Sequence, residues 1–283
     1  MTSPSRAWVV VVPVKPPDSA KTRMAHPSRP ELALAMAVDT IEAATQTPGV
    51  REVRVVTNDL AVAQEVRRAG VRVVSDDGAG DLNRCLASAV ARLPSAQPVA
   101  VMVADLPGAR PDELTRLLDS VPEQGVAVVG DRRGQGTTLL LATQPTRLHP
   151  QFGVGSLARH RAGGAVDLSE SAGPSLRLDV DTLDDLRDAV VASVGPATTA
   201  LVSALSSLGV VTGSVVQATV RSFDPANRSG TVLRDDGLEL DFDSGAFVAG
   251  GALKLRLGQR VRLTCDDQGV VTAVGIATFP GPD

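Results

Sequence analysis

Short apolar runs alternate with longer amphipathic stretches along the first two thirds of the chain. The runs are rich in β-branched residues, which is typical of strands buried in a parallel sheet. They lie at residues 8–12, 52–57, 71–75, 99–104, 126–130, 137–142 and 175–178. Stretches with apolar residues at helical spacing lie between and after them, at residues 31–45, 60–69, 82–92, 111–120 and 183–194. This alternation predicts βαβ units, and therefore an α/β domain with a mainly parallel sheet.

The pattern changes near residues 200–214. From residue 215 onward, short runs with period-two alternation follow one another, and Asp236-Gly237 is a hairpin signal. Several strands within fewer than 70 residues, with almost no helix, predict a small closed β-barrel. We therefore expect a large domain over residues 1–205, a linker over 206–214 and a barrel over 215–283.

Composition narrows the classes of protein. The chain has 283 residues, of which 43% are hydrophobic and only 2% aromatic, and its net charge of −4 gives no general attraction to nucleic acid or to an anionic membrane. Cys85 and Cys265 lie too far apart in sequence to suggest a disulfide framework or a metal cluster. No apolar run approaches the ~20 residues of a membrane span, and the N-terminus lacks a signal-peptide pattern. We expect a cytoplasmic protein without a membrane segment.

A cationic loop follows the first predicted strand. Three prolines end that strand, and the loop then carries Lys15, Lys21 and Arg23. Open α/β sheets bind ligands at the carboxyl ends of their strands, which is where this loop begins. The loop therefore suggests a site for a nucleotide triphosphate. The alternative is a solvated surface loop, and loop charge alone does not decide between the two.

Acidic residues follow two other apolar runs. Asp105 comes directly after residues 99–104, and Asp179 and Asp181 form the acidic pair of LDVDT. Residues i and i+2 of an extended segment point to the same side, and two carboxylates on one side repel each other unless a cation lies between them. The three acids are therefore candidate Mg²⁺ ligands. Asp105 could instead cap the helix from Pro111 onward, and Asp181 or Thr182 could cap the helix that begins near Leu183.

Two glycine-containing segments could bind anions. The first, at residues 130–140, combines Gly134 and Gly136 with the hydroxyls of Thr137 and Thr138. A hairpin turn would have a similar composition. The second, at residues 151–164, places small residues at the start of a predicted helix, where backbone N–H groups are available to a phosphate or carboxylate. These small residues are Gly153, Gly155 and Ser156.

Asp81 and Asn83 follow the third predicted strand, where the base or ribose of a nucleotide often meets the sheet edge. They could bind a nucleotide, although helix capping is the preferred interpretation of Asp81. The three histidines are scattered, which argues against a His-centred metal site. No serine or cysteine nucleophile motif is visible either.

Taken in order, these segments resemble the 2-phospho-L-lactate guanylyltransferase family, whose bacterial members are regarded as phosphoenolpyruvate guanylyltransferases of coenzyme F420 biosynthesis. The resemblance covers residues 8–200 and rests on VPVK with AKTRM, VADLP, GQGTT, FGVGSLARHR with GAV, and LDVDT. It implies a nucleotidyltransferase fold with a Rossmann-like sheet. It also implies that GTP binds over the first loop and that the phosphate of phosphoenolpyruvate or 2-phospho-L-lactate attacks the α-phosphorus, releasing pyrophosphate. The downstream deazaflavin transferase becomes a candidate partner.

The resemblance also implies roles for the residues. Lys15, Lys21 and Arg23 would hold the triphosphate and act in catalysis together with Asp105. Asp105, Asp179 and Asp181 would bind Mg²⁺, and the acceptor's phosphate and carboxylate would be held by Thr137 or Thr138, Gly153 and Ser156. An anionic acceptor needs no protein nucleophile, so catalysis would consist of alignment and charge neutralisation. A sister nucleotidyltransferase with a sugar-phosphate or molybdopterin acceptor is the nearest alternative.

The C-terminal segment resembles cold-shock, oligonucleotide-binding barrels in the order of TVRSFDPANRSGTVLRDDG and LRLGQRVRL. Ser222 replaces that family's first RNA-stacking aromatic residue. Residues 215–283 carry 7 Lys/Arg and 9 Asp/Glu, a net charge of 7 − 9 = −2, which opposes phosphate binding. Stacking contributes ~1 to 3 kcal/mol per base, so the loss of aromatic rings should remove most RNA affinity. We favour a structural or interaction role over a nucleic-acid-binding or regulatory protein that acts through this barrel.

Overall fold

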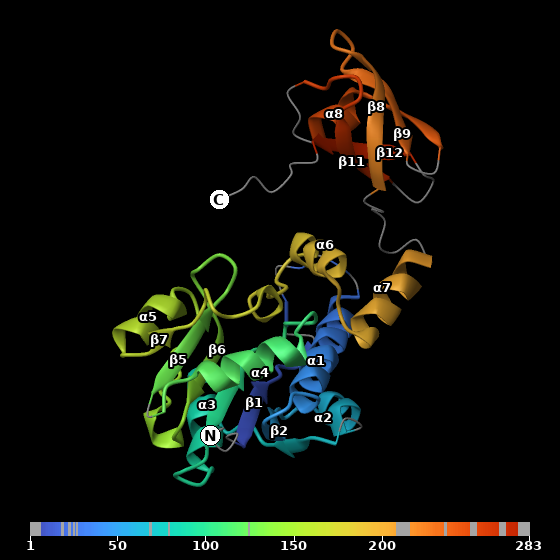
Figure 1. The fold of residues 1–283 in the computed structure, drawn as a ribbon. Helices are drawn as coiled ribbons and strands as arrows, with labels where there is room; N and C mark the ends of the chain where they lie inside the picture. The colour runs from blue at the N-terminus through green and yellow to red at the C-terminus, as the bar shows by residue number, and fades with distance from the viewer. Residues whose placement is uncertain are drawn as a thin grey trace. The chain divides into compact units, whose positions relative to one another are not determined.

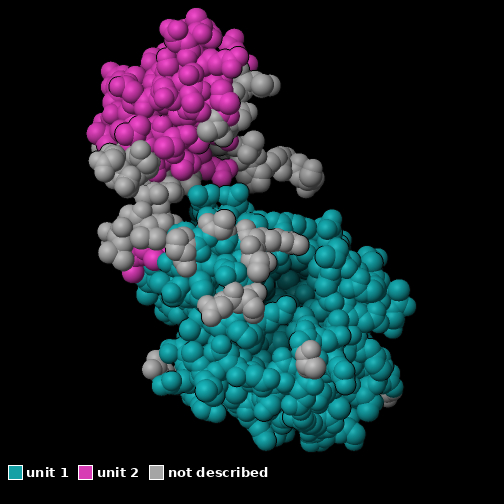
Figure 2. Space-filling model, turned by 180° about the vertical axis from the view of Figure 1, so that it is seen from behind, with its two compact units in different colours: residues 1–201 teal, residues 202–283 magenta. Residues whose placement is uncertain are grey.

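The computed structural model describes residues 7–17, 20–21, 24, 26, 28–67, 70–78, 80–123, 125–207, 216–234, 237–249, 254–265 and 270–276. The chain divides into two compact units, Met1–Leu201 and Val202–Asp283 (Figure 2). The division falls within helix α7, Pro196–Ser207.

The first unit is built on a seven-stranded sheet with the order β3-β2-β1-β4-β6-β5-β7 (Figure 1). Its strands are β1 Trp8–Pro13, β2 Val50–Val56, β3 Arg72–Val74, β4 Val99–Met102, β5 Val126–Gly130, β6 Thr137–Ala142 and β7 Val166–Asp167. Strand β6 runs antiparallel to β4 and β5, and the other neighbouring pairs are parallel. The predicted mainly parallel α/β sheet is therefore confirmed.

Helices lie on both faces of this sheet. Helices α1 Arg29–Thr45, α2 Leu60–Val66 and α4 Pro111–Ser120 contribute to one core cluster, and α3 Leu82–Ala91 and α5 Ser156–Ala162 contribute to the other. Helix α6, Leu183–Ala192, contributes to neither cluster. Successive residues of strand β1 pack on opposite faces of the sheet. Val10 lies in one core cluster with Ile41 of α1, and Val11 lies in the other with Leu86 of α3. Both faces of the strand are buried, so period-two alternation is absent from its sequence.

The prediction of a strand at residues 175–178 is wrong. A short 3₁₀ helix, Pro174–Leu176, occupies this segment, and the edge strand of the sheet is β7 instead. The backbone N–H and hydroxyl of Ser175 both donate to the Glu113 carboxylate, at 3.1 and 2.6 Å, while Leu176 is fully buried. A side-chain acceptor on α4 thus satisfies the backbone N–H of Ser175, which a strand would have paired within the sheet.

The second unit is a five-stranded antiparallel sheet with the order β10-β9-β8-β11-β12. Its elements are β8 Val216–Asp224, β9 Ser229–Arg234, β10 Glu239–Phe242, the short helix α8 Ser244–Ala249, β11 Arg260–Cys265 and β12 Val271–Ile276. Within the described residues of this unit, no strand pairing joins β10 to β12. The closed barrel and its cold-shock character therefore remain predictions.

The aromatic side chains of this sheet face its core. Phe223 stacks on Phe247 with ring centroids 5.1 Å apart and on Phe242 at 6.4 Å. At the position that lacks an aromatic ring, Ser222 Oγ is 2.8 Å from Thr231 Oγ1. These three rings contribute to packing rather than to a surface on which bases could stack.

Among the described residues, no single helix is both long and apolar enough to cross a membrane. Only taken together are Leu183–Ala192 and Pro196–Leu205 long and apolar enough for a span, and the two helices are bent by 119° relative to each other.

Candidate active site

A pocket of about 630 Å³ opens at the carboxyl ends of β1 and β4. The antiparallel strand β6 begins at this same edge, so residues from parallel and antiparallel strands meet there. The predicted site residues that line the pocket are Lys15, Lys21, Asp105, Thr137, Gly153, Ser156, Asp179 and Asp181. Tertiary structure thus brings together side chains that are separated by up to 166 residues, from Lys15 to Asp181.

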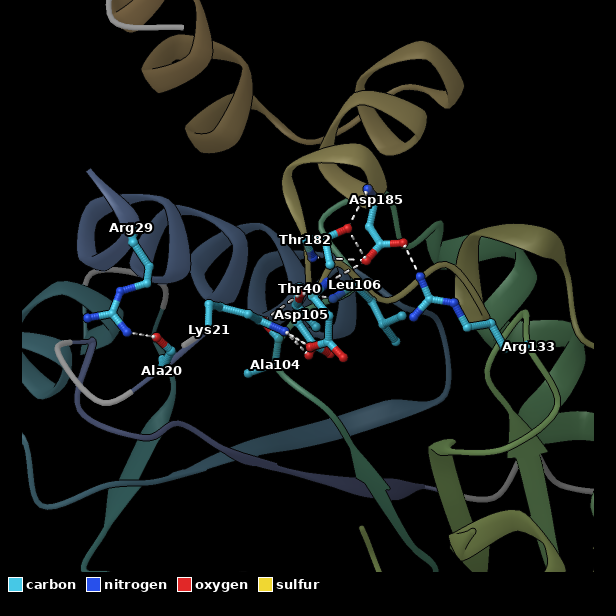
Figure 3. Close-up of polar contacts among 11 residues, drawn as sticks. Ala20, Lys21, Arg29, Thr40, Ala104, Asp105, Leu106, Arg133, Thr182 and Asp185 are labelled. Carbon is cyan, nitrogen blue, oxygen red and sulfur yellow. Dashed lines mark hydrogen bonds and ion pairs between the residues drawn. The ribbon is translucent and has the colours of Figure 1, made fainter. Parts of the chain in front are cut away.

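Asp105 sits in a turn that is held by Thr40 of α1 (Figure 3) and by the segment 179–181. The hydroxyl of Thr40 accepts a hydrogen bond from the Leu106 N–H at 3.1 Å. The N–H of Val180 donates to the main-chain oxygen of Asp105 at 3.0 Å. Because Val180 is anchored in this way, its two neighbours Asp179 and Asp181 are placed beside Asp105.

Lys21 lies between two of these acids. Its ammonium group donates to Asp105 Oδ2 and, at 3.0 Å, to Asp181 Oδ1, and only 10% of its side chain is exposed. Burial lowers the pKa of Lys21, but the charges of Asp105 and Asp181 outweigh burial and hold the pKa above its ordinary value. The backbone of Lys21 is left-handed, with φ of 53°. Because the ammonium of Lys21 contacts both Asp105 and Asp181, it balances part of the negative charge of the pocket.

Asp179 lies among other acids of the pocket. Burial raises its pKa to about 7, and the charges of Asp105, Asp181 and Asp131 add to the effect. Since the pKa is raised above its ordinary value of 3.8, the contribution of this carboxyl to stability is present below pH 3.8 and is lost as pH rises through about 7.

We therefore expect Asp179→Asn to stabilise the protein at pH 8 in the absence of divalent ions. The amide cannot ionise, so the midpoint of thermal unfolding should rise by several degrees at pH 8, and the gain should shrink toward pH 5. Melts of both proteins in EDTA at the two pH values measure this. Glu170→Gln, an exposed carboxyl-to-amide change, is the matched control. A gain that is equal at pH 5 and pH 8 would contradict the assignment.

The acids have the chemistry of a site for a hard divalent cation. Asp105 Oδ1 is buried without a hydrogen-bond partner, and carboxylate oxygens are the ligands that Mg²⁺ prefers. In the described part of the chain, however, no group of three or more His, Cys, Asp or Glu side chains is arranged to hold a metal ion. The ammonium of Lys21 bridges two of the predicted ligands in the arrangement observed.

Sequence reasoning missed two charged residues of the pocket wall, Asp131 and Arg133. Asp131 accepts from the N–H groups of Gln135 and Gly136 at 2.9 and 2.7 Å, which shapes the turn before β6. Arg133 donates to the buried Asp185 at 2.8 Å. Asp185 also forms a capping box with Thr182 at the start of α6. The Thr182 to Asp185 spacing is a capping signal in the sequence, but the arginine contact is not.

The other wall is the loop before α5. Gly153 and Gly155 adopt φ values of 118° and 71°, which favour glycine. Asn83 holds this loop, because its side chain donates to the Phe152 carbonyl at 3.1 Å and accepts from the Phe152 N–H at 2.6 Å. Asp81 caps α3, as the preferred interpretation predicted. Neither Asp81 nor Asn83 lines the pocket.

The two adjacent threonines of β6 point to opposite faces. Thr137 lines the pocket, whereas Thr138 is buried and donates to the Val129 carbonyl at 3.4 Å. Thr137 also contacts His160 and Ser156, both at 3.0 Å. No role for His160 is predicted from the sequence, because one isolated histidine has no metal or nucleophile pattern around it. Arg23, the third predicted cation, lies outside the described residues.

The family model for "Guanylyl transferase CofC like" proteins matches residues 8–211. The chain belongs to the CofC family of guanylyl transferases. A phosphoenolpyruvate guanylyltransferase from Streptomyces avermitilis is 45% identical over 205 residues, which cover 70% of this chain and 95% of the relative. One from Streptomyces scabiei is 46% identical over 209 residues, covering 70% and 97%. The sequence resemblance to the family is therefore confirmed.

A solved structure adds the fold of the CofC-like unit. A protein from Desulfovibrio desulfuricans G20, named as a nucleotide-diphospho-sugar transferase, matches with a TM-score of 0.52 at 14% identity, over 72% of this chain and 96% of that one. At this identity the match concerns the fold alone, and it agrees with the predicted nucleotidyltransferase sheet. Residues after 211 lie outside the match to the CofC family.

Proposed function

We propose that this chain is a phosphoenolpyruvate guanylyltransferase of coenzyme F420 biosynthesis, which transfers GMP from GTP to the phosphate of phosphoenolpyruvate. The observation that carries the proposal is one pocket of a CofC-like domain that is lined by Lys15 and Lys21, by three acids, and by Thr137, Gly153 and Ser156. Names of the curated relatives support phosphoenolpyruvate over 2-phospho-L-lactate as the acceptor.

In the proposed reaction, an oxygen of the acceptor's phosphate forms a bond to the α-phosphorus of GTP. The bond from that phosphorus to the oxygen bridging it to the β-phosphorus breaks, and pyrophosphate leaves. Both reactants are anions, so the chain has to neutralise their charge and align them. Lys15 and Lys21 supply positive charge beside the triphosphate, and the sequence adds Arg23 as a further candidate. Thr137, Gly153 and Ser156 hold the acceptor.

Mg²⁺ is the proposed cofactor, and Asp105, Asp179 and Asp181 would hold it. When bound, it would neutralise the phosphate oxygens of GTP. The unpartnered Asp105 Oδ1 and the raised pKa of Asp179 support this assignment, since both describe negative charge and acceptor capacity in excess of what Lys21 satisfies. For its part, the Lys21 ammonium would exchange its carboxylate partners for phosphate oxygens as the substrate enters.

The test is turnover with defined acceptors. We expect the purified chain to release pyrophosphate from GTP in the presence of Mg²⁺ and phosphoenolpyruvate. Because guanylylated phosphoenolpyruvate can be labile, the downstream transferase and its deazaflavin acceptor should be present. Omission of phosphoenolpyruvate controls for GTP hydrolysis. Turnover only with 2-phospho-L-lactate, a sugar phosphate or molybdopterin would reassign the acceptor, and no turnover with any of them would reject the function.

A further inference from the structure

Three buried side chains form a hydrogen-bonded row along one wall of the pocket. The row consists of Thr137 of β6, which is 7% exposed, and of Ser156 and His160 of α5, which are 1% and 3% exposed. Ser156 Oγ donates to Thr137 Oγ1 at 3.0 Å, and Thr137 Oγ1 lies 3.0 Å from His160 Nδ1. Thr137 and Ser156 line the pocket, whereas His160 does not. His160 reaches the pocket through the two hydroxyls and through the ring of Phe152, a pocket residue whose centroid lies 5.4 Å from that of His160 in an edge-on contact.

The backbone fixes which nitrogen of His160 carries the proton. The Gln151 N–H donates to His160 Nε2 at 2.9 Å, and a peptide N–H can only donate. Nε2 must therefore present a lone pair, which places the proton of the neutral ring on Nδ1. Burial, followed by the charge of Arg159, lowers the pKa of His160 to about 4, so the ring is neutral near pH 7. The Arg159 guanidinium itself donates to the carbonyls of Val154 and Gln151.

This tautomer sets the direction of the remaining hydrogen bonds. His160 Nδ1–H donates to Thr137 Oγ1, so neither hydroxyl proton is used on the histidine. One of the two hydroxyl protons lies in the bond between Ser156 and Thr137. The other has no acceptor among the described side chains and is available to the pocket. With the opposite tautomer, Thr137 would donate to the ring and the pocket would receive no hydroxyl proton.

We infer that His160 is a positioning residue, which holds Thr137 and Ser156 so that one hydroxyl proton is always directed at an anionic oxygen of the acceptor. Carboxylate and phosphate oxygens only accept hydrogen bonds, so a hydroxyl that is obliged to donate favours them. The identity of the acceptor rests on the proposed function, but the state of His160 does not.

Two substitutions at His160 separate the roles of its nitrogens. The Asn side chain can place an N–H where Nδ1–H lies, whereas the longer Gln side chain reaches toward the Nε2 position and leaves Thr137 without its donor. We expect His160→Gln to raise the KM for phosphoenolpyruvate about 10- to 100-fold, with the KM for GTP changed by less than about twofold. His160→Asn should restore most of the loss.

A double-mutant cycle tests whether His160 acts through the hydroxyl. Thr137→Val alone should raise the KM for phosphoenolpyruvate about as much as His160→Gln does. Combining the two changes should add little, because the second removes a hydrogen bond that has already been lost. Additive losses, or equal increases in the KM for GTP and for the acceptor, would show that His160 only supports the fold and would overturn the inference.

Inhibition by fragments of the acceptor identifies which oxygen receives the hydroxyl proton. Inorganic phosphate and pyruvate each carry one of the two anionic groups. We expect His160→Gln to weaken inhibition by only one of them, and that one names the group bound. Unchanged inhibition by both fragments would contradict the assignment.

Nitrogen NMR of the imidazole rings reads the tautomer directly. In the wild-type protein at pH 7, His160 should be neutral, with its proton on Nδ1. The chain has only three histidines, and His160→Asn identifies the signal by its loss. A protonated Nε2 would overturn the inference whatever the substrate. The expected tautomer in a protein that fails to use phosphoenolpyruvate would instead reject the proposed function and leave His160 oriented for a different anionic acceptor.

Discussion

Asp105→Asn should reduce kcat/KM by about a thousandfold without unfolding the protein. Asn preserves the shape of the side chain, and the main-chain oxygen of residue 105 still accepts the Val180 N–H. What it removes is the carboxylate that binds Lys21 and whose second oxygen has no partner. Steady-state rates with GTP, Mg²⁺ and phosphoenolpyruvate measure the loss, and circular dichroism measures the fold.

Asp119→Asn is the matched control for this experiment. Asp119 is exposed on α4, and the substitution makes the same chemical change away from the pocket. Its turnover should stay within about twofold of wild type, as is usual for surface substitutions. Full activity in Asp105→Asn would remove Asp105 from the reaction, and a collapsed fold would show that the residue is needed for structure first.

Lys21→Met should impair both stability and the use of GTP. Removing one partner of a mostly buried ion pair costs about 3 kcal/mol or more, because the remaining charges stay behind without compensation. Here the remaining charges are those of Asp105 and Asp181, and both also repel the carboxylate of Asp179. We therefore expect a lower thermal midpoint at pH 8 in EDTA, and Asp179→Asn in the same chain should recover part of the loss.

The kinetic effect of Lys21→Met should fall mainly on the nucleotide. The KM for GTP should rise about 10- to 100-fold while the KM for phosphoenolpyruvate changes little, since a charge-assisted hydrogen bond to phosphate is lost. Charge reversal at this position should have the same selectivity and a larger effect. Lys254→Met, an exposed lysine of the second unit, controls for the loss of a positive charge. A selective increase in the KM for phosphoenolpyruvate would place Lys21 on the acceptor's side of the pocket.

The sequence predicted most of the elements around the pocket. Apolar runs such as residues 8–12 and 99–104 are strong signals, because central strands of a parallel sheet are buried on both faces. Residues that follow such strands share one edge of the sheet, so Lys15 and Asp105 could be placed together from their order alone. The same reasoning wrongly predicted a strand at residues 175–178. The apolar residues of this segment are buried by a 3₁₀ turn instead, with Glu113 serving as the acceptor.

The contacts inside the pocket could not be predicted in the same way. Three of these contacts have no periodic or local signature in the sequence. They are the ion pairs of Lys21, the bond from Arg133 to Asp185, and the hydrogen bonds between Asn83 and Phe152. Each joins residues that lie more than 50 positions apart, and each depends on side-chain direction as well as position. Thr137 and Thr138 illustrate this: adjacent in sequence, they point to opposite faces, and only the register of β6 decides which one meets the pocket.

By itself, the sequence determined the sheet class of the first unit, the family to which it belongs and the segments that meet at the pocket, because burial periodicity and motif order are properties of the chain. Tertiary structure alone decided how those segments act on one another. Tertiary structure buries Asp179 and places it near Asp105, Asp181 and Asp131, and both effects raise the pKa of the Asp179 carboxyl. It also places His160, which is isolated in the sequence pattern, within hydrogen-bond distance of Thr137. Electrostatic coupling and hydrogen-bond direction depend on distance and orientation, and these exist only after the chain has folded.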